Sequence, residues 1–261
     1  MVAGPILKTP GEIERMKGAG RVVADALQLV GSLIVPGVST LQLDRAVEDL
    51  IRGSGGIPAF LGYPSPTPGV RPFPASICVS INEEVVHGIP SENRKLKAGD
   101  IVSIDVGVEK DGFFGDAART YPVGPLGRRE ERLLETGAEA LARATAKMRP
   151  NTPLLEVSRA IQTCAEENHF SVVRKFVGHG IGRFMHEPPQ VPNYVARGMP
   201  GRNIVLHPGA VLALEPMLNY GTSDVDVLED GWTVVTQDRK WSVHFEDTVA
   251  VGADGPMVLT L

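Results

Sequence analysis

The feature that most constrains how this chain can fold is an internal repetition of short polar motifs. Each half contains, in the same order, a His-Gly pair, an acid within an apolar run and an acid that opens another apolar run. The matching segments are "HGI" at His87 and at His179, "AGDIVSID" ending at Asp105 and "PGAVLALE" ending at Glu215, and "DAARTYPVG" from Asp116 and "EDTVAVG" from Glu246. Three ordered matches predict two similar halves that bring these groups to one shared interface.

The repetition extends to the helical part of each half. The tripeptide "RAV" in the first half and "RAI" in the second lie at the same distance after Pro36 and Pro150. Repeats of many copies form solenoids, whereas two copies are too few to do so. We therefore expect residues 1–261 to form a single domain with a pseudo-two-fold axis, in which the repeats cover approximately 10–125 and 126–261.

The composition excludes several classes of protein. The 261 residues are 43% hydrophobic and 22% charged, with a net charge of −5, which is ordinary for a globular domain and differs from the basic excess of nucleic-acid-binding proteins. Two cysteines, Cys78 and Cys164, are too few for a disulfide scaffold, and they suit a reducing compartment. The N-terminus has no signal-peptide pattern, and no apolar run is long enough to span a bilayer. We therefore expect a cytoplasmic monomer without membrane or specific nucleic-acid partners.

The spacing of apolar and turn-forming residues predicts a mixed α+β chain. Apolar residues recur every three or four positions in four segments, and Ser39 with Gln42 forms a capping-box pattern at the start of the second. The segment "KDGFFGD" contains the Asp-Gly signal of a hairpin turn. The expected helices are 13–34, 39–53, 129–147 and 154–168, the expected strands lie in "SICVSI", "DIVSIDVGV", "AVLALEP", "WTVVT" and "HFEDTVAV", and 62–74 is expected to be an irregular loop rich in Pro and Gly.

The acids in the repeated strands need a partner that the apolar runs do not offer. Alternation along a strand puts Asp105 on one face with Ile101 and Ser103, and Glu215 in similar surroundings. An ionised carboxylate that is buried alone is costly, and several together repel one another. Two divalent cations that share carboxylates remove both problems. Because the donors are rich in oxygen and include no thiolate, they favour Mn²⁺, Fe²⁺ or Co²⁺, with Zn²⁺ and Ni²⁺ as further candidates.

Each of these residues by itself has a simpler interpretation. A single acid at a strand end is usually a cap or an ion-pair partner, and a single buried histidine is usually a hydrogen-bonded core residue. The two matched triplets favour a metal site for the set. His169, His207 and His244 lie outside the matched pattern, and we interpret them as surface or packing residues, with His244 alternatively supporting the neighbouring Glu246.

Longer segments of the chain resemble the type I methionine aminopeptidases of bacteria. These segments are "SIDVGVEKDGFFGDAARTYPVG", "GHGIGRFMHEPPQVPNY", "LALEPML" and "HFEDT", and the resemblance extends from about Thr9 to the end. It implies the pita-bread (creatinase/aminopeptidase) fold, with a curved, mainly antiparallel sheet, helices on its outer face and a pseudo-two-fold axis through the metal site. It also implies a metal-dependent hydrolase that removes N-terminal methionine from nascent proteins and peptides and prefers a small second residue.

The resemblance further implies roles for individual residues. The two divalent ions would be held by Asp105, Asp116, His179, Glu215 and Glu246. Glu215 would also act as general base and then as general acid, His87 would contact the substrate, and His186 would hydrogen-bond the scissile peptide. The methionine side chain would be held by Phe60, Tyr63, Phe73, Cys78, Met185 and Trp232. A monovalent cation, Na⁺ or K⁺, would lie near Asn82 and Ser242.

Two features depart from the pattern of many relatives. The Pro-rich segment 64–72 looks like an insertion next to Phe73, and Asp247 follows Glu246 where many methionine aminopeptidases have His. A Glu-Asp pair is common in the related proline-directed peptidases, so an X-Pro aminopeptidase or prolidase is one alternative, although these usually carry an additional N-terminal domain. A binding protein that kept the fold is another, although such proteins normally lose metal ligands. As partners we expect nascent polypeptides and a transient ribosome contact.

Overall fold

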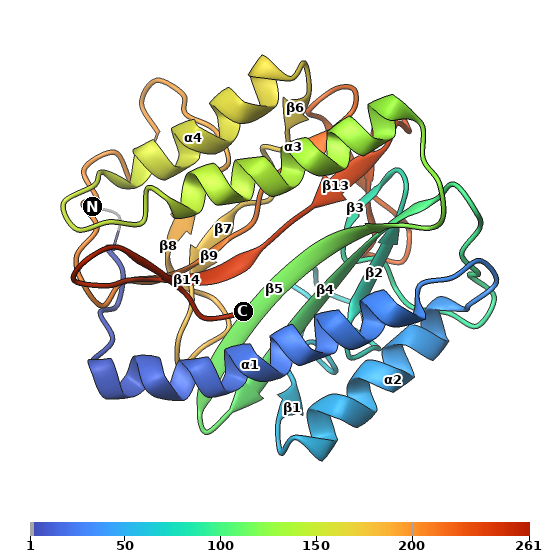
Figure 1. Ribbon diagram of the computed structural model, residues 1–261, viewed down its shortest axis with the longest axis horizontal. Helices are drawn as coiled ribbons and strands as arrows, with labels where there is room; N and C mark the ends of the chain where they lie inside the picture. The colour runs from blue at the N-terminus through green and yellow to red at the C-terminus, as the bar shows by residue number, and fades with distance from the viewer. Residues whose placement is uncertain (1–2, 200) are drawn as a thin grey trace.

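Four helices and a series of antiparallel strands alternate along the chain (Figure 1). The computed structural model describes residues 3–199 and 201–261. The helices are α1 (Pro10–Leu33), α2 (Thr40–Gly53), α3 (Arg128–Thr145) and α4 (Leu154–Glu167). The strands are β1 (Ile57–Pro58), β2 (Cys78–Ile81), β3 (Glu84–Val86), β4 (Ile101–Lys110), β5 (Phe113–Pro122), β6 (Ser171–Val172), β7 (Gly178–Gly180), β8 (Glu187–Val191), β9 (Val211–Leu214), β10 (Met217–Asn219), β11 (Val225–Val227), β12 (Val234–Thr236), β13 (Ser242–His244), β14 (Asp247–Val251) and β15 (Pro256–Val258).

The first two helices begin at reciprocal side-chain caps. The Ser39 hydroxyl accepts a hydrogen bond from the Gln42 amide while the Gln42 side chain accepts from the Ser39 amide, as the sequence predicts. Thr9 and Glu12 form the same capping box for α1. The predicted start of the first helix is three residues late, because its cap lies before the first apolar residue of the periodic pattern.

The first half packs one face of a sheet against α1 and α2. Strand β4 pairs with β1, β2 and β5, and every pair is antiparallel. The even-numbered side chains Val102, Ile104 and Val106 join the core beneath the two helices. Because side chains alternate along a strand, Ser103 and Asp105 face the opposite side, toward the middle of the molecule.

The second half repeats this arrangement with α3 and α4. Strand β9 lies between β14 and β7 in an antiparallel sheet. Leu212 and Leu214 belong to the core that includes the buried residues of these two helices. Val211 and Ala213 belong to a different cluster, on the face from which the next odd-numbered residue, Glu215, also extends.

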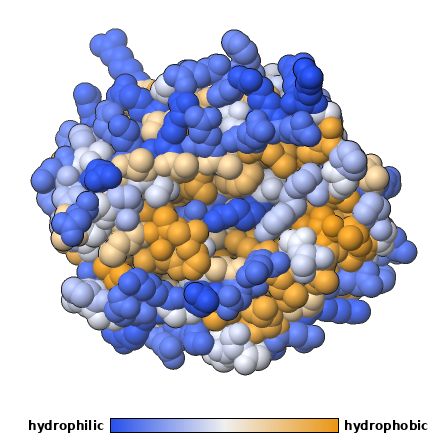
Figure 2. Space-filling model, viewed as in Figure 1, coloured by the Kyte–Doolittle hydropathy of each residue, from blue (hydrophilic) through white to orange (hydrophobic). Residues whose placement is uncertain are grey.

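The two helix pairs lie on opposite sides of the molecule with the strands between them (Figure 1). Figure 2 shows hydrophilic residues over the outer surfaces of the helices and apolar residues gathered in the band between the two pairs. The predicted α+β fold with antiparallel sheets and covering helices is confirmed. Among the helices of the described residues, none has an apolar stretch that could cross a membrane.

The run "HFEDTVAV" forms two strands rather than the single predicted one. Strand β13 ends at His244 and β14 begins at Asp247. Between them, Glu246 donates its amide to the Ala118 carbonyl (2.9 Å) and accepts from the Ala118 amide (3.3 Å). This antiparallel bridge joins the second half to β5 of the first half, so the chain leaves its own sheet in order to connect the two.

Candidate active site

The first half contributes two aspartates from one hairpin. Strands β4 and β5 pair Gly107 with Asp116 and Asp105 with Ala118, so both carboxylates stand on the same face of neighbouring strands. The turn residues Asp111 and Gly112 both have positive φ, 51° and 74°, as the Asp-Gly hairpin signal predicts. Because a slip of one residue would turn every side chain to the other face, this turn helps to fix the position of the two acids.

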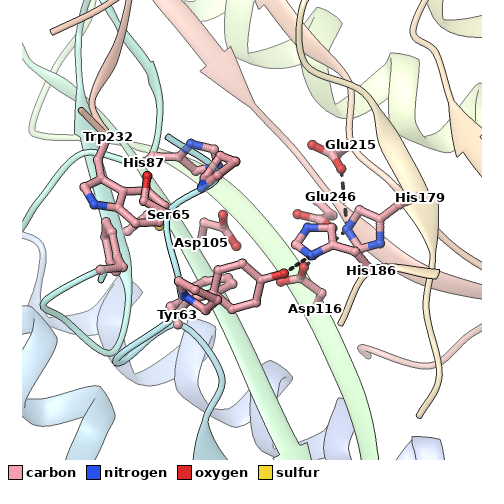
Figure 3. A pocket seen from close by; sticks show the side chains of 15 residues that line it. Tyr63, Ser65, His87, Asp105, Asp116, His179, His186, Glu215, Trp232 and Glu246 are labelled. Carbon is pink, nitrogen blue, oxygen red and sulfur yellow. Dashed lines mark hydrogen bonds and ion pairs between the residues drawn. The ribbon is translucent and has the colours of Figure 1, made fainter. Parts of the chain in front are cut away.

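The second half contributes two glutamates and a histidine from one sheet. Glu215 follows β9 and Glu246 precedes β14, at the end where Leu214 is paired with Asp247. His179 of β7 is paired with Ala213. The His179 Nε2 atom lies 3.7 Å from Glu215 Oε1 and 3.9 Å from Asp116 Oδ2, which belongs to the first half (Figure 3).

Hydrogen bonds hold the two halves together next to these acids. The Thr248 hydroxyl accepts from the Asp116 amide (3.0 Å) and donates to the Asp116 carbonyl (2.8 Å). The Arg119 guanidinium donates to Asp247 Oδ1 (2.7 Å), and the Thr260 hydroxyl donates to the same oxygen (2.8 Å). Asp247 is therefore an ion-pair partner of Arg119.

Burial controls the charge of the cluster. Burial raises the pKa of Asp105 to about 7. It also raises the pKa values of Asp116, Glu215 and Glu246, to which the negative charge of the neighbouring carboxylates adds. Burial lowers the pKa of His179 to about 3, so this imidazole is neutral. Its Nδ1 lies 2.8 Å from the Gly180 carbonyl, an acceptor, which places the proton on Nδ1 and leaves the Nε2 lone pair facing the acids.

The donor atoms of the cluster fit divalent cations. Among the described residues, buried oxygens of Asp105, Asp116 and Glu246 have no hydrogen-bond partner. Ligand atoms of Asp116, His179 and Glu246 lie within 4.8 Å of one another, and a second group of the same kind contains Asp105, His244 and Glu246. Buried carboxylates without partners are costly unless a cation neutralises them. Oxygen donors with neutral imidazoles are a suitable set for such a cation.

The other two predicted site histidines lie on either side of the acids. The His186 ring is centred 4.2 Å from that of His179, and its Nδ1 is hydrogen-bonded to the Tyr63 hydroxyl at 2.6 Å (Figure 3). His87 has a left-handed φ of 60°, an uncommon conformation for a residue with a side chain. Its ring meets Phe176 and Trp232 edge-on, with centroids 5.7 and 6.3 Å away, and burial lowers its pKa to about 4. His87 and His179 occupy matching positions of the sequence repeat, but their surroundings in the structure differ.

A cavity of about 490 Å³ connects the acids to a group of aromatic residues. It is lined by Phe60, Tyr63, Pro64, Ser65, Pro66, Phe73, Cys78, His87, Asp105, Asp116, His179, His186, Glu215, Trp232 and Glu246. Phe73 is 2% exposed and meets Trp232 edge-on at 5.2 Å between ring centroids. The structure thus brings five of the six predicted pocket residues to this cavity.

Met185 is the exception, because it does not line the cavity. A side chain at Gly107 would come within 2.8 Å of the Phe60 ring and 2.9 Å of the Met185 methyl group, so both side chains pack directly on this part of β4. Met185 is buried in the cluster that also contains Ile13. Met185 therefore lies behind Phe60 in this structure, and its predicted contact with the methionine side chain stays a prediction.

The Pro-rich segment 64–72 contributes lining residues that the sequence did not indicate. Pro64, Ser65 and Pro66 face the cavity. The same segment is held to the opposite wall, because the Trp232 indole N–H donates to the Arg71 carbonyl (2.9 Å). The sequence feature that could have indicated this role is the location of the segment between two predicted pocket residues, Tyr63 and Phe73.

Asn82 and Ser242 are neighbours, as the predicted monovalent-cation site requires. The Ser242 amide donates to the Asn82 carbonyl (2.8 Å), and the Asn82 side chain donates to Asp100 (2.9 Å). The Ser242 hydroxyl donates to the Asn219 side chain (2.8 Å). Occupancy of this location by Na⁺ or K⁺ stays a prediction.

The histidines outside the repeat divide into two kinds. His169 and His207 are exposed, as expected. His244 is 2% exposed, and its Nε2 lies 3.6 Å from Glu246 Oε2. It is therefore not a surface residue, and its location agrees with the alternative interpretation that places it beside the acids.

Comparisons with known proteins agree with this geometry. The model of metallopeptidase family M24 matches residues 14–253. The methionine aminopeptidase 1 of Bacillus subtilis is 47% identical over 255 residues, covering 98% of each chain. The crystal structure of the methionine aminopeptidase of Thermotoga maritima superposes with a TM-score of 0.91 at 43% identity, covering 100% of this chain and 99% of the other. A prolidase of Pyrococcus horikoshii shares the fold at a TM-score of 0.75 and 21% identity, with 98% of this chain and 64% of the other covered.

Proposed function

Because the chain belongs to metallopeptidase family M24, we propose that it removes the N-terminal methionine from peptides and nascent proteins with the help of two divalent cations. The observation that carries this proposal is the cavity itself. One of its ends contains four carboxylates, three of them buried, and a neutral imidazole, and the other is lined by aromatic side chains and a thiol. The first end suits hydrolysis and the second suits an apolar side chain.

In this proposal the cations are held by the acids and one histidine from both halves. The ligands are Asp105, Asp116, His179, Glu215 and Glu246, which lie together at one end of the cavity. Divalent ions bound there supply Lewis acidity and make a water molecule more acidic. The raised pKa values of the carboxyl groups support this proposal, because cations would compensate the charge of all four when ionised.

Glu215 is the residue to which we assign proton transfer. It follows the end of β9, is half-buried at the cavity wall and has a pKa raised by burial and by Asp116. A carboxyl group with a raised pKa can accept a proton from the attacking water and return it to the leaving amine. The His179 Nε2 atom, 3.7 Å from Glu215, carries no proton and therefore does not donate to this carboxylate. Glu215 thus stays available to accept a proton from water.

His186 and His87 are placed to orient the scissile peptide. His186 is exposed at the cavity next to His179 and is oriented by the Tyr63 hydroxyl, so it can donate to the scissile carbonyl oxygen as negative charge develops there. His87 is neutral and stands between Phe176 and Trp232. We assign it a hydrogen bond to the peptide that is cleaved, and we propose that the second residue of the substrate, which would lie beside it, is preferably small.

The aromatic end of the cavity suits a methionine side chain. Phe73 and Trp232 meet edge-on there, and burial raises the pKa of Cys78, which keeps its thiol neutral. A thioether makes favourable contacts with aromatic rings, commonly at the ring edge. A short, unbranched apolar side chain therefore fits this end better than a charged one would.

The experiment that tests the function is methionine release from Met-Ala-Ser. We expect turnover that is abolished by a chelator and restored by at least one of Co²⁺, Mn²⁺, Fe²⁺, Zn²⁺ or Ni²⁺. A Gly-Pro peptide in parallel tests the prolidase alternative, whose structural likeness extends to the fold alone. Cleavage of Gly-Pro in preference to Met-Ala-Ser would favour that alternative, and no cleavage with any metal would favour a binding protein.

The substrate class also defines the proposed partners. Nascent polypeptides with an N-terminal methionine are the natural substrates of such an activity, which places it in the cytoplasm where these chains emerge. A transient contact with the ribosome and a monomeric state stay predictions.

A further inference from the structure

A second buried imidazole, that of His244, lies beside the cluster of acids. It is the last residue of β13 and is 2% exposed. Its Nε2 atom is buried and has no hydrogen-bond partner among the described residues. Together with carboxylate oxygens of Asp105 and Glu246, this nitrogen forms a group whose atoms all lie within 4.8 Å of one another.

The backbone of His244 is fixed from the first half of the chain. The Thr120 hydroxyl accepts from the His244 amide and donates to the His244 carbonyl, both at 2.9 Å. The same hydroxyl is 2.8 Å from that of Ser103, which stands on the face of β4 that also carries Asp105. His244 is therefore held across the junction of the two halves, as the acids are.

A hydrogen bond to Glu246 does not account for this imidazole. The Nε2–Oε2 separation of 3.6 Å is longer than a hydrogen bond, and a second Glu246 oxygen, Oε1, is also buried without a partner. The separation of His244 Nε2 and Glu246 Oε2 is suitable for two ligands of the same cation, each about 2 Å from it.

We propose that His244 Nε2 is a direct ligand of the divalent cation held by Asp105 and Glu246. This inference rests on the proposed two-metal function and extends it. Each of the two cations then has one imidazole, His179 on one side and His244 on the other, and Glu246 belongs to both groups. Because imidazole donors suit Zn²⁺, Fe²⁺ and Ni²⁺ better than an all-oxygen set does, the second ion should be retained more strongly than carboxylates alone would allow.

The test counts coordinated imidazoles in the Co²⁺-loaded protein. Calorimetric titration first establishes that two Co²⁺ ions bind, and proton NMR then records hyperfine-shifted signals that disappear in D₂O, which come from ring N–H groups of coordinated histidines. We expect two such signals in the unmodified protein and one in His244→Gln. We also expect His244→Gln to weaken one of the two binding steps by at least about tenfold, and the exposed His169→Gln to change neither readout.

The possible failures separate the two proposals. Two bound ions with a single imidazole signal in the unmodified protein would overturn the role of His244 and leave the two-metal function standing. No bound ion would overturn both. The signal count in the unmodified protein decides the matter even where His244→Gln fails to fold, and unchanged signals in a folded His244→Gln would also contradict the proposal.

Discussion

The two ends of the cavity are built in different ways. The acids and His179 belong to, or directly adjoin, paired strands from both halves, namely β4, β5, β7, β9 and β14. The aromatic end is formed mainly by loop residues, including Phe60, Phe73 and Trp232, and by the Pro-rich segment 64–72. Strands hold a catalytic arrangement more accurately than loops do, whereas loops tolerate insertions. The difference suggests that the strands support the chemistry and that the loops select the substrate.

The largest expected effect comes from the acid end. Glu215→Gln removes the proposed proton acceptor while it keeps an oxygen donor, so turnover of Met-Ala-Ser should fall by about 10²–10⁴-fold. Steady-state kinetics with a fixed excess of metal measure this loss. The exposed Glu229→Gln serves as the matched control and should keep full activity. Turnover near that of the control would show that Glu215 does not transfer the proton.

Asp105→Asn should weaken metal binding and leave the aromatic pocket unchanged. Asp105 is buried, and one of its oxygens has no protein partner, so an amide in its place loses the charge that attracts a cation. We expect at least about a tenfold to hundredfold loss of affinity for one of two ions, measured by titration calorimetry. The exposed Asp226→Asn should bind metal normally. Unchanged affinity in Asp105→Asn would remove Asp105 from the ligand set.

At the aromatic end we expect a substitution to weaken substrate binding and to leave metal binding intact. Phe73 is 2% exposed, and its replacement by alanine should lower the free energy of unfolding by about 3–5 kcal/mol through the cavity that it leaves. KM for methionine peptides should rise, but two divalent ions should still bind. Loss of metal binding in folded Phe73→Ala would show that the two ends are not separable in the way proposed.

The acid end was predictable from the sequence because alternation along a strand is a local property. Asp105 shares a face with Ser103 in the structure because Val102 and Ile104 must pack under the helices. The exact locations of Met185 and His244 were not predictable, for the opposite reason. The side to which Met185 turns depends on contacts with Gly107, and the location of His244 depends on the break between β13 and β14 that lets Glu246 pair with Ala118. These are contacts between distant segments, which periodicity does not encode.

The charge of the acid end predicts how pH affects the metal-free protein. At pH 6.5 the buried histidines, whose pKa values are lowered, are neutral in the folded chain and about half protonated in the unfolded chain. They are neutral in both by pH 8, an effect that opposes but does not outweigh the change at the four carboxyl groups. Asp105 has a pKa of about 7 when folded against 3.8 for an unperturbed aspartate, and the pKa values of the other three carboxyl groups are also raised. The folded state therefore holds more protons, and stability falls as pH rises.

Thermal unfolding with a chelator should thus give a lower Tm at pH 8 than at pH 6.5. The metal-loaded protein should lose less, because the cations replace the protons and bind more strongly as the carboxyl groups ionise. A metal-free Tm that rises over this interval would contradict the assigned burial of the acids.

The smallest expected effect concerns the contact between Trp232 and the Pro-rich segment 64–72. Trp232→Phe keeps an aromatic ring against Phe73 but removes the indole donor to the Arg71 carbonyl. Loss of one such bond should raise KM for Met-Ala-Ser by about twofold to tenfold, which corresponds to about 0.5–1.5 kcal/mol, with kcat unchanged. A change in kcat without a change in KM would mean that the Pro-rich segment affects the chemistry rather than substrate selection.

The central claim is that the junction of the two halves holds two cations. It is tested most directly by the anomalous scattering of Mn²⁺ in crystals of the metal-loaded protein. The account predicts two peaks about 3.5–4 Å apart, one beside His179 and Glu215 and the other beside Asp105, with Asp116 and Glu246 close to both. A single peak, or no peak among these side chains, would contradict it.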